Sequence, residues 1–396
     1  MPRTGDALVI GLVALAHGLS HFFQLIIAPL FPLIKEELGV SYAALGFVVT
    51  LFYALSAMCQ PVAGFVVDRF GGRAVLLGGV TCLTLGTLVA GSASSYGMLV
   101  AGAALAGVGN SVFHPADFSI LNARVGSERL GYAYSAHGIA GSLGYASAPI
   151  FSGGVGALFG WHSALFAAAG VGACMLLLLL ANWRRLHMQD RHGKRPEGHT
   201  DLRILFAAPV VMCFLYFAIY AAGLSGLQSF SVSAMAVQYE VTAALASSAL
   251  TAYMIGSAAG IFAGGFIATR VARHDLVAAA GLALSASCVS TIAFGAIPGT
   301  ALPVMLALAG FCVGATGPSR DMIVRASTPA GATGRVYGFV YSGLDVGSLS
   351  TPVFYGWLMD HHLPQGVFYT VAVLTLLAMF TVLQLPGRRP AAIQRT

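Results

Sequence analysis

Histidine and glutamine side chains recur at helical spacing within the first long apolar stretch of this chain. His17, His21 and Gln24 stand at positions i, i+4 and i+7, so a helix would carry all three on one face. Ionisable side chains in an apolar segment are costly, and by default they mark a substrate or ion pathway. Because histidine changes charge near neutral pH, we expect these residues to contact a substrate or to carry protons.

A second polar group stands in the stretch Val112-Phe-His-Pro-Ala-Asp-Phe-Ser119. We interpret His114 and Asp117 as pathway residues. A purely structural role for His114 stays open, because the bend expected at Pro115 also needs polar partners.

The histidines also have some features of a metal site. His17 and His21 have the spacing of metal ligands on a helix, and His114 and His137 would complete a set of four. Cysteine and a local carboxylate are missing from this set, so we predict no metal site.

The second half of the chain contains fewer polar candidates. Arg320 is followed directly by Asp321, and an unpaired arginine in a membrane would need a carboxylate or an anionic substrate. Adjacent residues point to different sides of a helix, which weakens a local pair. Asp345 is the most isolated charge and is suited to proton uptake and release. His137 and Gln228 complete the predicted pathway.

The elements that must position these residues are transmembrane helices. Of the 396 residues, 57% are hydrophobic and 9% charged, and the mean hydropathy is +0.82. Soluble domains carry roughly 25% charged residues, so a soluble protein is excluded. The apolar runs lack the alternation of outer-membrane strands. We expect an all-α membrane protein with twelve spans, at residues 7–34, 41–67, 74–92, 97–123, 131–155, 160–182, 204–233, 241–269, 276–297, 299–324, 334–358 and 365–385.

The positive charges of the chain predict its orientation. All but Lys35 and Arg320 of the 20 lysines and arginines fall at or near alternate loops and the two termini. This pattern places both termini and the loop 183–203 in the cytoplasm of a bacterial cell, with the spans in its inner membrane. It also argues against a nucleic-acid partner, despite the net charge of +6.

The two halves of the chain repeat each other. Gly64-Phe-Val-Val-Asp-Arg recurs as Gly265-Phe-Ile-Ala-Thr-Arg at an offset of 201, and glycine, proline and tyrosine positions match further on at an offset of 203. Parallel repeats are a transporter architecture with the substrate site at their interface. We predict two six-helix bundles related by a pseudo-two-fold axis along the membrane normal, at residues 1–182 and 204–396, joined by the linker 183–203.

The short charged hairpin Gly64-Phe-Val-Val-Asp-Arg-Phe-Gly-Gly-Arg73 resembles the signature between the second and third helices of the major facilitator superfamily. The predicted gating residues are Gly64, Asp68, Arg69, Gly71 and Arg73. We expect the glycines to allow close approach of the helix ends. The resemblance implies that Asp68 caps the start of the helix near Gly334 when the inner gate is closed, as a carboxylate at a helix N-terminus should.

The sequence Val-Phe-His-Pro is similar, more narrowly, to the fosmidomycin-resistance branch of that superfamily. An acidic residue directly follows His-Pro in that branch, whereas here Ala116 does and Asp117 comes one position later. The resemblance implies a proton-coupled exporter of a small organic molecule or drug. Two alternatives stay open: proton-coupled uptake of a small organic anion, and a non-transporting receptor or metal-handling protein with the same fold.

The expected partners are a small-molecule substrate, protons and the lipid bilayer, with the protein as a monomer. Only two lysines are present and neither follows a phosphate-binding glycine loop, so we expect no ATP hydrolysis, no enzyme and no cofactor.

Asp117 and Arg320 are equivalent in the repeat, and we therefore predict that they pair across the two halves in one state of the transporter and separate in the other.

Overall fold

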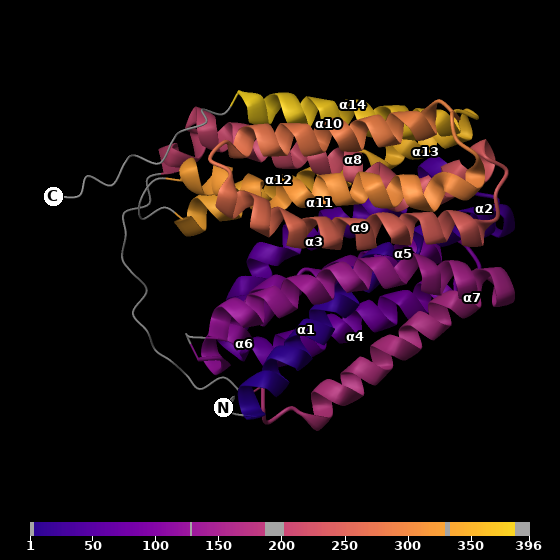
Figure 1. Ribbon diagram of the computed structural model, residues 1–396. Helices are drawn as coiled ribbons and strands as arrows, with labels where there is room; N and C mark the ends of the chain where they lie inside the picture. The colour runs from indigo at the N-terminus through magenta and orange to yellow at the C-terminus, as the bar shows by residue number, and fades with distance from the viewer. Residues whose placement is uncertain (1–3, 127–128, 187–201, 329–332, 385–396) are drawn as a thin grey trace.

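The computed structural model describes residues 4–126, 129–186, 202–328 and 333–384, and these residues are almost entirely helical. The predicted all-α fold is confirmed. The described chain contains ten helical segments that are long and apolar enough to cross a membrane. Figure 1 shows the helices gathered into two groups, most of the first half of the chain below and the second half above, with the start of α1 and the end of α14 on the same side.

The first half begins with α1 (Thr4–Leu25), which reaches the short α2 (Phe31–Leu38) through a 3₁₀ turn, η1 (Ala28–Leu30). The other helices of this half are α3 (Tyr42–Phe70), α4 (Gly72–Gly91), α5 (Tyr96–Asn110), α6 (Phe113–Arg124) and α7 (Leu130–Ala181).

The second half begins with a 3₁₀ turn, η3 (Leu202–Phe206). Its helices are α8 (Ala208–Gln238), α9 (Ala243–Arg270), α10 (His274–Ala293), α11 (Leu302–Ala326), α12 (Thr333–Ser350), α13 (Pro352–Asp360) and α14 (Pro364–Leu383), with η4 (Gly299–Ala301) before α11.

The number of crossings depends on how two of these segments are divided. Residues Ala133–Ala181 form one 49-residue apolar segment, and it is broken at Gly160, whose φ of 83° is outside the helical range. Since about 20 residues suffice for one crossing, this segment has the length of two. Helices α12 and α13 are separated only by Thr351. Dividing the long segment at Gly160 and counting α12 with α13 as one further crossing would agree with twelve spans. The number twelve itself stays a prediction.

Prolines account for most of the other interruptions. Pro29 lies in η1, Pro115 in the first turn of α6, and Pro352 is the first residue of α13. Proline lacks a backbone N–H and fixes φ, so it is tolerated in the first turn of a helix and interrupts a helix elsewhere. The bend expected at Pro115 coincides with the break between α5 and α6, whereas Pro61, Pro149 and Pro318 lie inside helices that continue through them.

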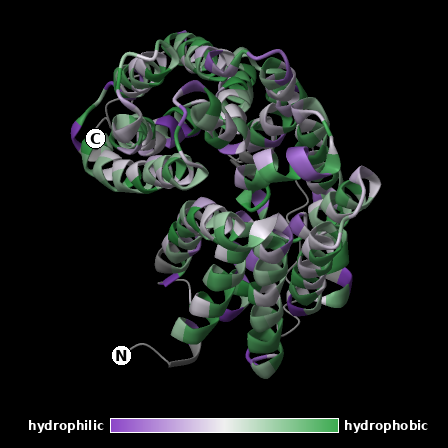
Figure 2. Cartoon of the chain, turned by 90° about the vertical axis from the view of Figure 1, so that its right-hand side faces the viewer, coloured by the Kyte–Doolittle hydropathy of each residue, from purple (hydrophilic) through white to green (hydrophobic). Residues whose placement is uncertain are grey.

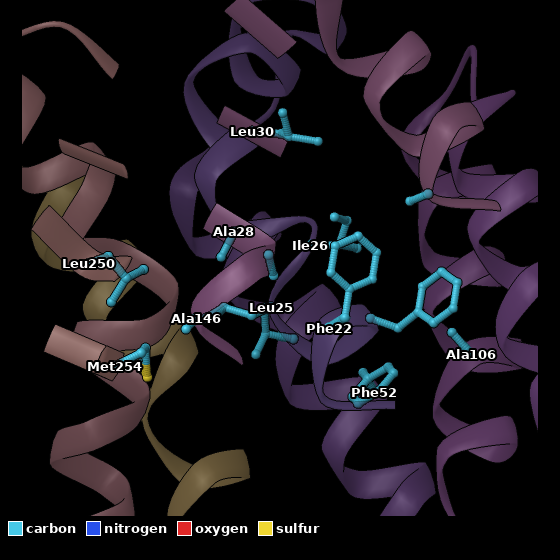
Figure 3. Close-up of a cluster of buried hydrophobic side chains, with 14 of the residues drawn as sticks. Phe22, Leu25, Ile26, Ala28, Leu30, Phe52, Ala106, Ala146, Leu250 and Met254 are labelled. Carbon is cyan, nitrogen blue, oxygen red and sulfur yellow. The ribbon is translucent and has the colours of Figure 1, made fainter. Parts of the chain in front are cut away.

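The two halves meet mainly at the end of the molecule opposite the termini. Helix α3 packs against α12 and α13, α7 packs against α9, and η1 packs against α8. Figure 3 shows part of this contact, where Ala146 of α7 lies beside Leu250 and Met254 of α9. Thr251 of α9 donates a hydrogen bond to the carbonyl oxygen of Ala146, 2.9 Å away. These contacts use the first half of α9 and the middle of α7.

The outward surface of the bundle is apolar, as a lipid-facing surface requires. Leu158, Phe159 and Phe262 are each more than two-thirds exposed, and Met58 and Phe65 are similarly open. In Figure 2, which views the molecule from the end where the halves meet, hydrophobic residues cover most of the periphery. Such a surface would be a liability in water and is expected in hydrocarbon.

The repeat is visible in how helices pack within each half. A Cβ atom on Gly144 of α7 would collide with the carbonyl oxygen of Gly18 in α1, and a Cβ on Gly347 of α12 would collide with that of Ala218 in α8. Gly144 and Gly347 are repeat partners at the offset of 203. Gly144 contacts Gly18, and Gly347 contacts Ala218, so Gly18 and Ala218 occupy equivalent positions. The first helices of the two halves, α1 and α8, therefore align at an offset of 200 residues.

Candidate functional site

Three helices of the first half bring a carboxylate and two histidines together. Asp117 of α6 is completely buried. Its Oδ2 atom lies 3.1 Å from Nε2 of His137 in α7 and 3.4 Å from Nδ1 of His17 in α1. An ionised group is tolerated at such a position only with partners of this kind. We call His17, His114, His137 and Asp117 the histidine–aspartate cluster.

The imidazole rings of this cluster are packed against one another. The rings of His17 and His137 are stacked, with centroids 3.4 Å apart and an interplanar angle of 18°. His114 lies at its edge, 5.2 Å from His17 and 6.1 Å from His137 between ring centroids. His114 is exposed, whereas the other two histidines are buried. Phe118, one turn further along α6, stacks on His114 at 6.0 Å.

Backbone packing between α1 and α7 holds the His17 ring in place. A Cβ atom on Gly141 would lie 3.1 Å from Nε2 of His17, a tight contact, so a glycine at this position eases the close approach of α7. Nε2 therefore faces the α7 backbone, while Nδ1 is the atom nearest Asp117. The ring of His21 lies 4.5 Å from that of His17, one turn along α1.

A separate hydrogen-bond network begins at Gln24. Tyr145 donates to Oε1 of Gln24 at 2.5 Å, and Nε2 of Gln24 donates to Asn110 at 3.1 Å. Asn110 donates in turn to Ser56 at 2.9 Å. The sequence identifies Gln24 but not the other three, because each is a single uncharged residue on a different helix. Asn110, an isolated asparagine in an apolar run, was the one feature of the sequence that could have indicated this network.

The second half holds its charges differently. Nε of Arg320 lies 3.1 Å from Oδ1 of Asp321, which also accepts a hydrogen bond from Tyr341 at 2.9 Å. The guanidinium group of Arg320 lies over the ring of Phe217, 4.8 Å from its centroid. The local pair with Asp321, which the sequence left open, is thus formed, because the long arginine side chain can turn back to its neighbour.

The predicted pair between Asp117 and Arg320 is not formed in this structure. Asp117 is enclosed within its own half by His17 and His137, and Arg320 is bound by Asp321. The sequence reasoning placed both side chains at a seam between the halves. Asp117 instead points into the first bundle, so a pair with Arg320 would first require the histidine–aspartate cluster to open.

The remaining pathway candidates lie apart from that cluster. Asp345 of α12 is half-buried and interacts electrostatically with Tyr53 of α3 and Tyr145 of α7, which both belong to the other half. Asp345 is thus at the contact between the halves. Gln228 is buried in α8.

The charged hairpin between α3 and α4 has two structural anchors. Gly71 has a φ of 82°, a conformation that favours glycine. The Arg73 guanidinium group lies 4.2 Å from the ring centroid of Trp183 and donates a hydrogen bond to its carbonyl oxygen at 3.4 Å. Arg69 lies over the adjacent ring of Phe70.

A Cβ atom on Gly64 would meet open space, so close approach of a neighbouring helix does not require glycine there in this conformation. The prediction that Asp68 caps the helix near Gly334 falls on side chains outside the described part of the structure. The linker 183–203 is described only at its two ends.

A cross-half cap that the sequence analysis missed lies at the opposite end of the molecule. The carboxylate of Asp360, at the end of α13, accepts hydrogen bonds from the backbone N–H groups of Tyr42 and Ala43, at 2.7 and 2.8 Å. Lys35 lies 3.5 Å from the same carboxylate. Asp360 thus caps the N-terminus of α3, where the helix dipole favours negative charge. A lone acidic residue in a predicted outer turn was the only sequence signal.

Helices packed in this way around a central contact are typical of transporters with two repeats, and a comparison with known families agrees. Residues 13–233 and 221–395 each match the model of the Major Facilitator Superfamily. The chain belongs to the Major Facilitator Superfamily.

Several relatives carry descriptive names. The chain is 25% identical over 391 residues to the fosmidomycin resistance protein of Escherichia coli, covering 96% of this chain and 93% of that protein. It is 27% identical over 226 residues to a multidrug resistance protein B homolog of Mycobacterium tuberculosis, covering 54% and 41%. A bacillibactin exporter of Bacillus subtilis is 32% identical over 88 residues, covering 21% of this chain and 22% of that protein.

Solved structures share the fold. A bacterial homolog of the human lysosomal transporter Spinster, in an inward-facing and unoccupied conformation, has a TM-score of 0.79 at 18% identity and covers 99% of this chain and 100% of that chain. The occupied inward-facing form has a TM-score of 0.80 at 16% identity, covering 97% of each chain. The predicted superfamily, with its resemblance to the fosmidomycin-resistance branch, is confirmed.

Proposed function

We propose that the protein is a secondary active exporter that exchanges a small organic molecule or drug for protons by alternating access. Relatives named for fosmidomycin resistance, multidrug resistance and bacillibactin export support export over uptake. The positive charges of the sequence support a place in the bacterial inner membrane with both termini in the cytoplasm. The exporter would act as a monomer and would need no cofactor.

The observation that best supports alternating access is the cap that the Asp360 carboxylate forms on the N-terminus of α3. It joins α13 of one half to α3 of the other at the end predicted to face outward. Glycine packing surrounds it, since a Cβ on Gly356 would collide with Tyr42 and one on Gly46 with Pro352. A contact that exists in only one state biases the equilibrium between states by its own free energy. The cap would hold the outer end closed while substrate enters from the cytoplasm.

Removing the charge at the outer cap tests this reading. Asp360→Asn weakens two charge-assisted hydrogen bonds and the Lys35 contact, and we expect a cost of about 1–2 kcal/mol to the outward-closed state. Single cysteines introduced near Tyr42 should then react faster with an impermeant thiol reagent added from outside. The matched control is His361→Gln at the next, exposed residue. Unchanged labelling in Asp360→Asn would contradict a gating role for the cap.

Asp345 is the proposed proton carrier. It is at the contact between the halves, beside Tyr53 and Tyr145, where its surroundings would change as the halves move. A carboxylate that meets the two sides in turn can load a proton on one side and release it on the other. Asp117 is enclosed within one half, which makes it less suited to this role.

Transport measurements test the coupling. In inside-out vesicles with an acidic interior, we expect radiolabelled fosmidomycin, as the first probe, to accumulate in the wild type. Asp345→Asn should abolish this uphill accumulation, while counterflow at equal pH should survive because it needs no net proton movement. A panel of other antimicrobials follows if fosmidomycin is not carried. Full pH-driven accumulation by Asp345→Asn would remove Asp345 from the mechanism, and a lack of flux for every probe would favour a receptor.

Uptake of an organic anion is less well supported. Arg320 could anchor an anionic substrate in either direction of transport, and in the structure it has a carboxylate partner in Asp321. An anion would have to displace that partner before it could bind.

A further inference from the structure

We propose that His17, His114, His137 and Asp117 form a binding site for one divalent transition-metal ion. Each of the three histidines offers a ring nitrogen, and these nitrogens all lie within 4.8 Å of one another. The carboxylate that the sequence set lacked is supplied by Asp117, whose Oδ2 already contacts two of the rings. Three imidazoles and a carboxylate make up a complete ligand set for a four-coordinate ion.

The orientation of the rings favours this role. Nδ1 of His17 and Nε2 of His137 both point toward the same oxygen of Asp117, while Nε2 of His17 faces the backbone at Gly141. The donor atoms therefore converge on one side of the stacked rings. Ligand nitrogens about 2.0–2.1 Å from a tetrahedral Zn²⁺ lie about 3.4 Å from each other, so ring movements of about 1 Å would complete the site.

Buried polar atoms without a partner mark the same place. Nδ1 of His17 and Oδ1 of Asp117 are buried and have no hydrogen bond within the described structure. Buried polar groups are normally satisfied, and each exception calls for a water, an ion or another explanation. A metal ion bound here would use these lone pairs. His114, which is exposed, provides the third nitrogen.

The chemistry of the donors selects the kind of ion. Imidazole suits Zn²⁺, Cu²⁺, Ni²⁺ and Co²⁺, whereas Mg²⁺ and Ca²⁺ prefer sites made of oxygen atoms alone. All four ligands belong to α1, α6 and α7 of the first half. A bound ion would therefore tie three helices of one bundle together without bridging the two halves, and it would not depend on transport.

Equilibrium binding to the full-length protein tests the site. The protein is purified in detergent without a histidine tag and titrated with Co²⁺, whose visible absorption reports tetrahedral nitrogen and oxygen coordination, and Zn²⁺ is then added as a competitor. We expect one equivalent of Co²⁺ with tetrahedral bands that Zn²⁺ displaces. Binding should also raise the thermal unfolding midpoint, because the ion stabilises only the folded state.

Variants separate this site from surface histidines. Both His137→Gln and the exposed His114→Gln should weaken binding at least about 100-fold, the upper end of what outer-shell losses cause. His114→Gln leaves the buried core intact, so its result does not depend on folding. The double variant His361→Gln with His362→Gln is the matched control and should bind as the wild type does. Absence of tetrahedral Co²⁺ bands, or binding lost only in the control, would overturn the proposal, and neither result would bear on export.

Discussion

The two halves place different chemistry on the same backbone frame. Gly144 contacts α1 at Gly18 in the first half, and its repeat partner Gly347 contacts α8 at Ala218 in the second. In this alignment His17 corresponds to Phe217, as Asp117 corresponds to Arg320. Both pairs are in contact: His17 lies 3.4 Å from Asp117, and Phe217 lies under the Arg320 guanidinium group at 4.8 Å.

The surroundings of the two charges differ as much as their signs. The Asp117 side chain is 0% exposed, and its Oδ2 atom is contacted by histidines from two other helices. Arg320 is 23% exposed, and its partner Asp321 is 46% exposed and adjacent in sequence. Removing one partner of a fully buried pair is costly, whereas partly exposed pairs contribute little. The repeat has kept the small residues that set helix spacing and has let the polar groups diverge.

Exchanging the two charges should have the largest effect. Asp117→Arg places a bulky cation in an enclosed space beside two histidines, and we expect a loss of about 3–5 kcal/mol in the free energy of unfolding. Adding Arg320→Asp should not restore stability, because the two positions have different partners. The measurement is thermal unfolding in detergent, followed by size-exclusion chromatography.

The single variant Arg320→Asp serves as the reference for this exchange and should cost less. A double variant more stable than Asp117→Arg alone would show that the two residues meet after all, and the contrast between the halves would fail.

The shared backbone frame predicts a matched pair of smaller effects. Gly144→Ala and Gly347→Ala should each destabilise the protein by about 1–3 kcal/mol, because the added methyl group meets a backbone carbonyl that cannot move away. Gly11→Ala in α1 is the control, since a Cβ there has open space and alanine favours a helix. Thermal unfolding of all three variants checks the symmetry, and a large effect at only one of the two sites would break it.

The smallest expected difference in stability between the halves comes from replacing an aspartate in each half by neutral asparagine. Asp117→Asn leaves a buried histidine without a charged acceptor, and we expect a cost of about 1–2 kcal/mol. Asp321→Asn should cost less than about 1 kcal/mol, because that carboxylate is half exposed and the side-chain amide can still accept from Tyr341. Both variants can be compared by the same unfolding assay in low and high salt. Equal losses at the two positions would mean that burial does not set the difference.

Much of the fold follows from local or summed properties of the chain. Hydropathy alone determines that the helices lie in a membrane, because a run of apolar residues has the same preference whatever it packs against. Interruptions at Pro29, Pro115 and Pro352 follow from the geometry of a single residue. The internal repeat could be predicted because matching glycines and prolines preserve helix spacing in both halves, and the superfamily could be predicted because the charged hairpin 64–73 resembles its signature.

The contacts of the candidate site were decided only by tertiary structure. His17 and Asp117 are 100 residues apart, and Asp360 caps a helix that begins more than 300 residues earlier. Which carboxylate contacts which basic side chain depends on the rotation and tilt of each helix. Neighbouring residues in the sequence do not determine that rotation or tilt. The sequence identified His17, His114, Asp117 and His137 as polar residues within apolar segments, and the structure brings these four together. The pair that repeat symmetry predicts between Asp117 and Arg320 in one state of the transporter is absent here, where each residue has a partner within its own half, and it stays a prediction for the other state.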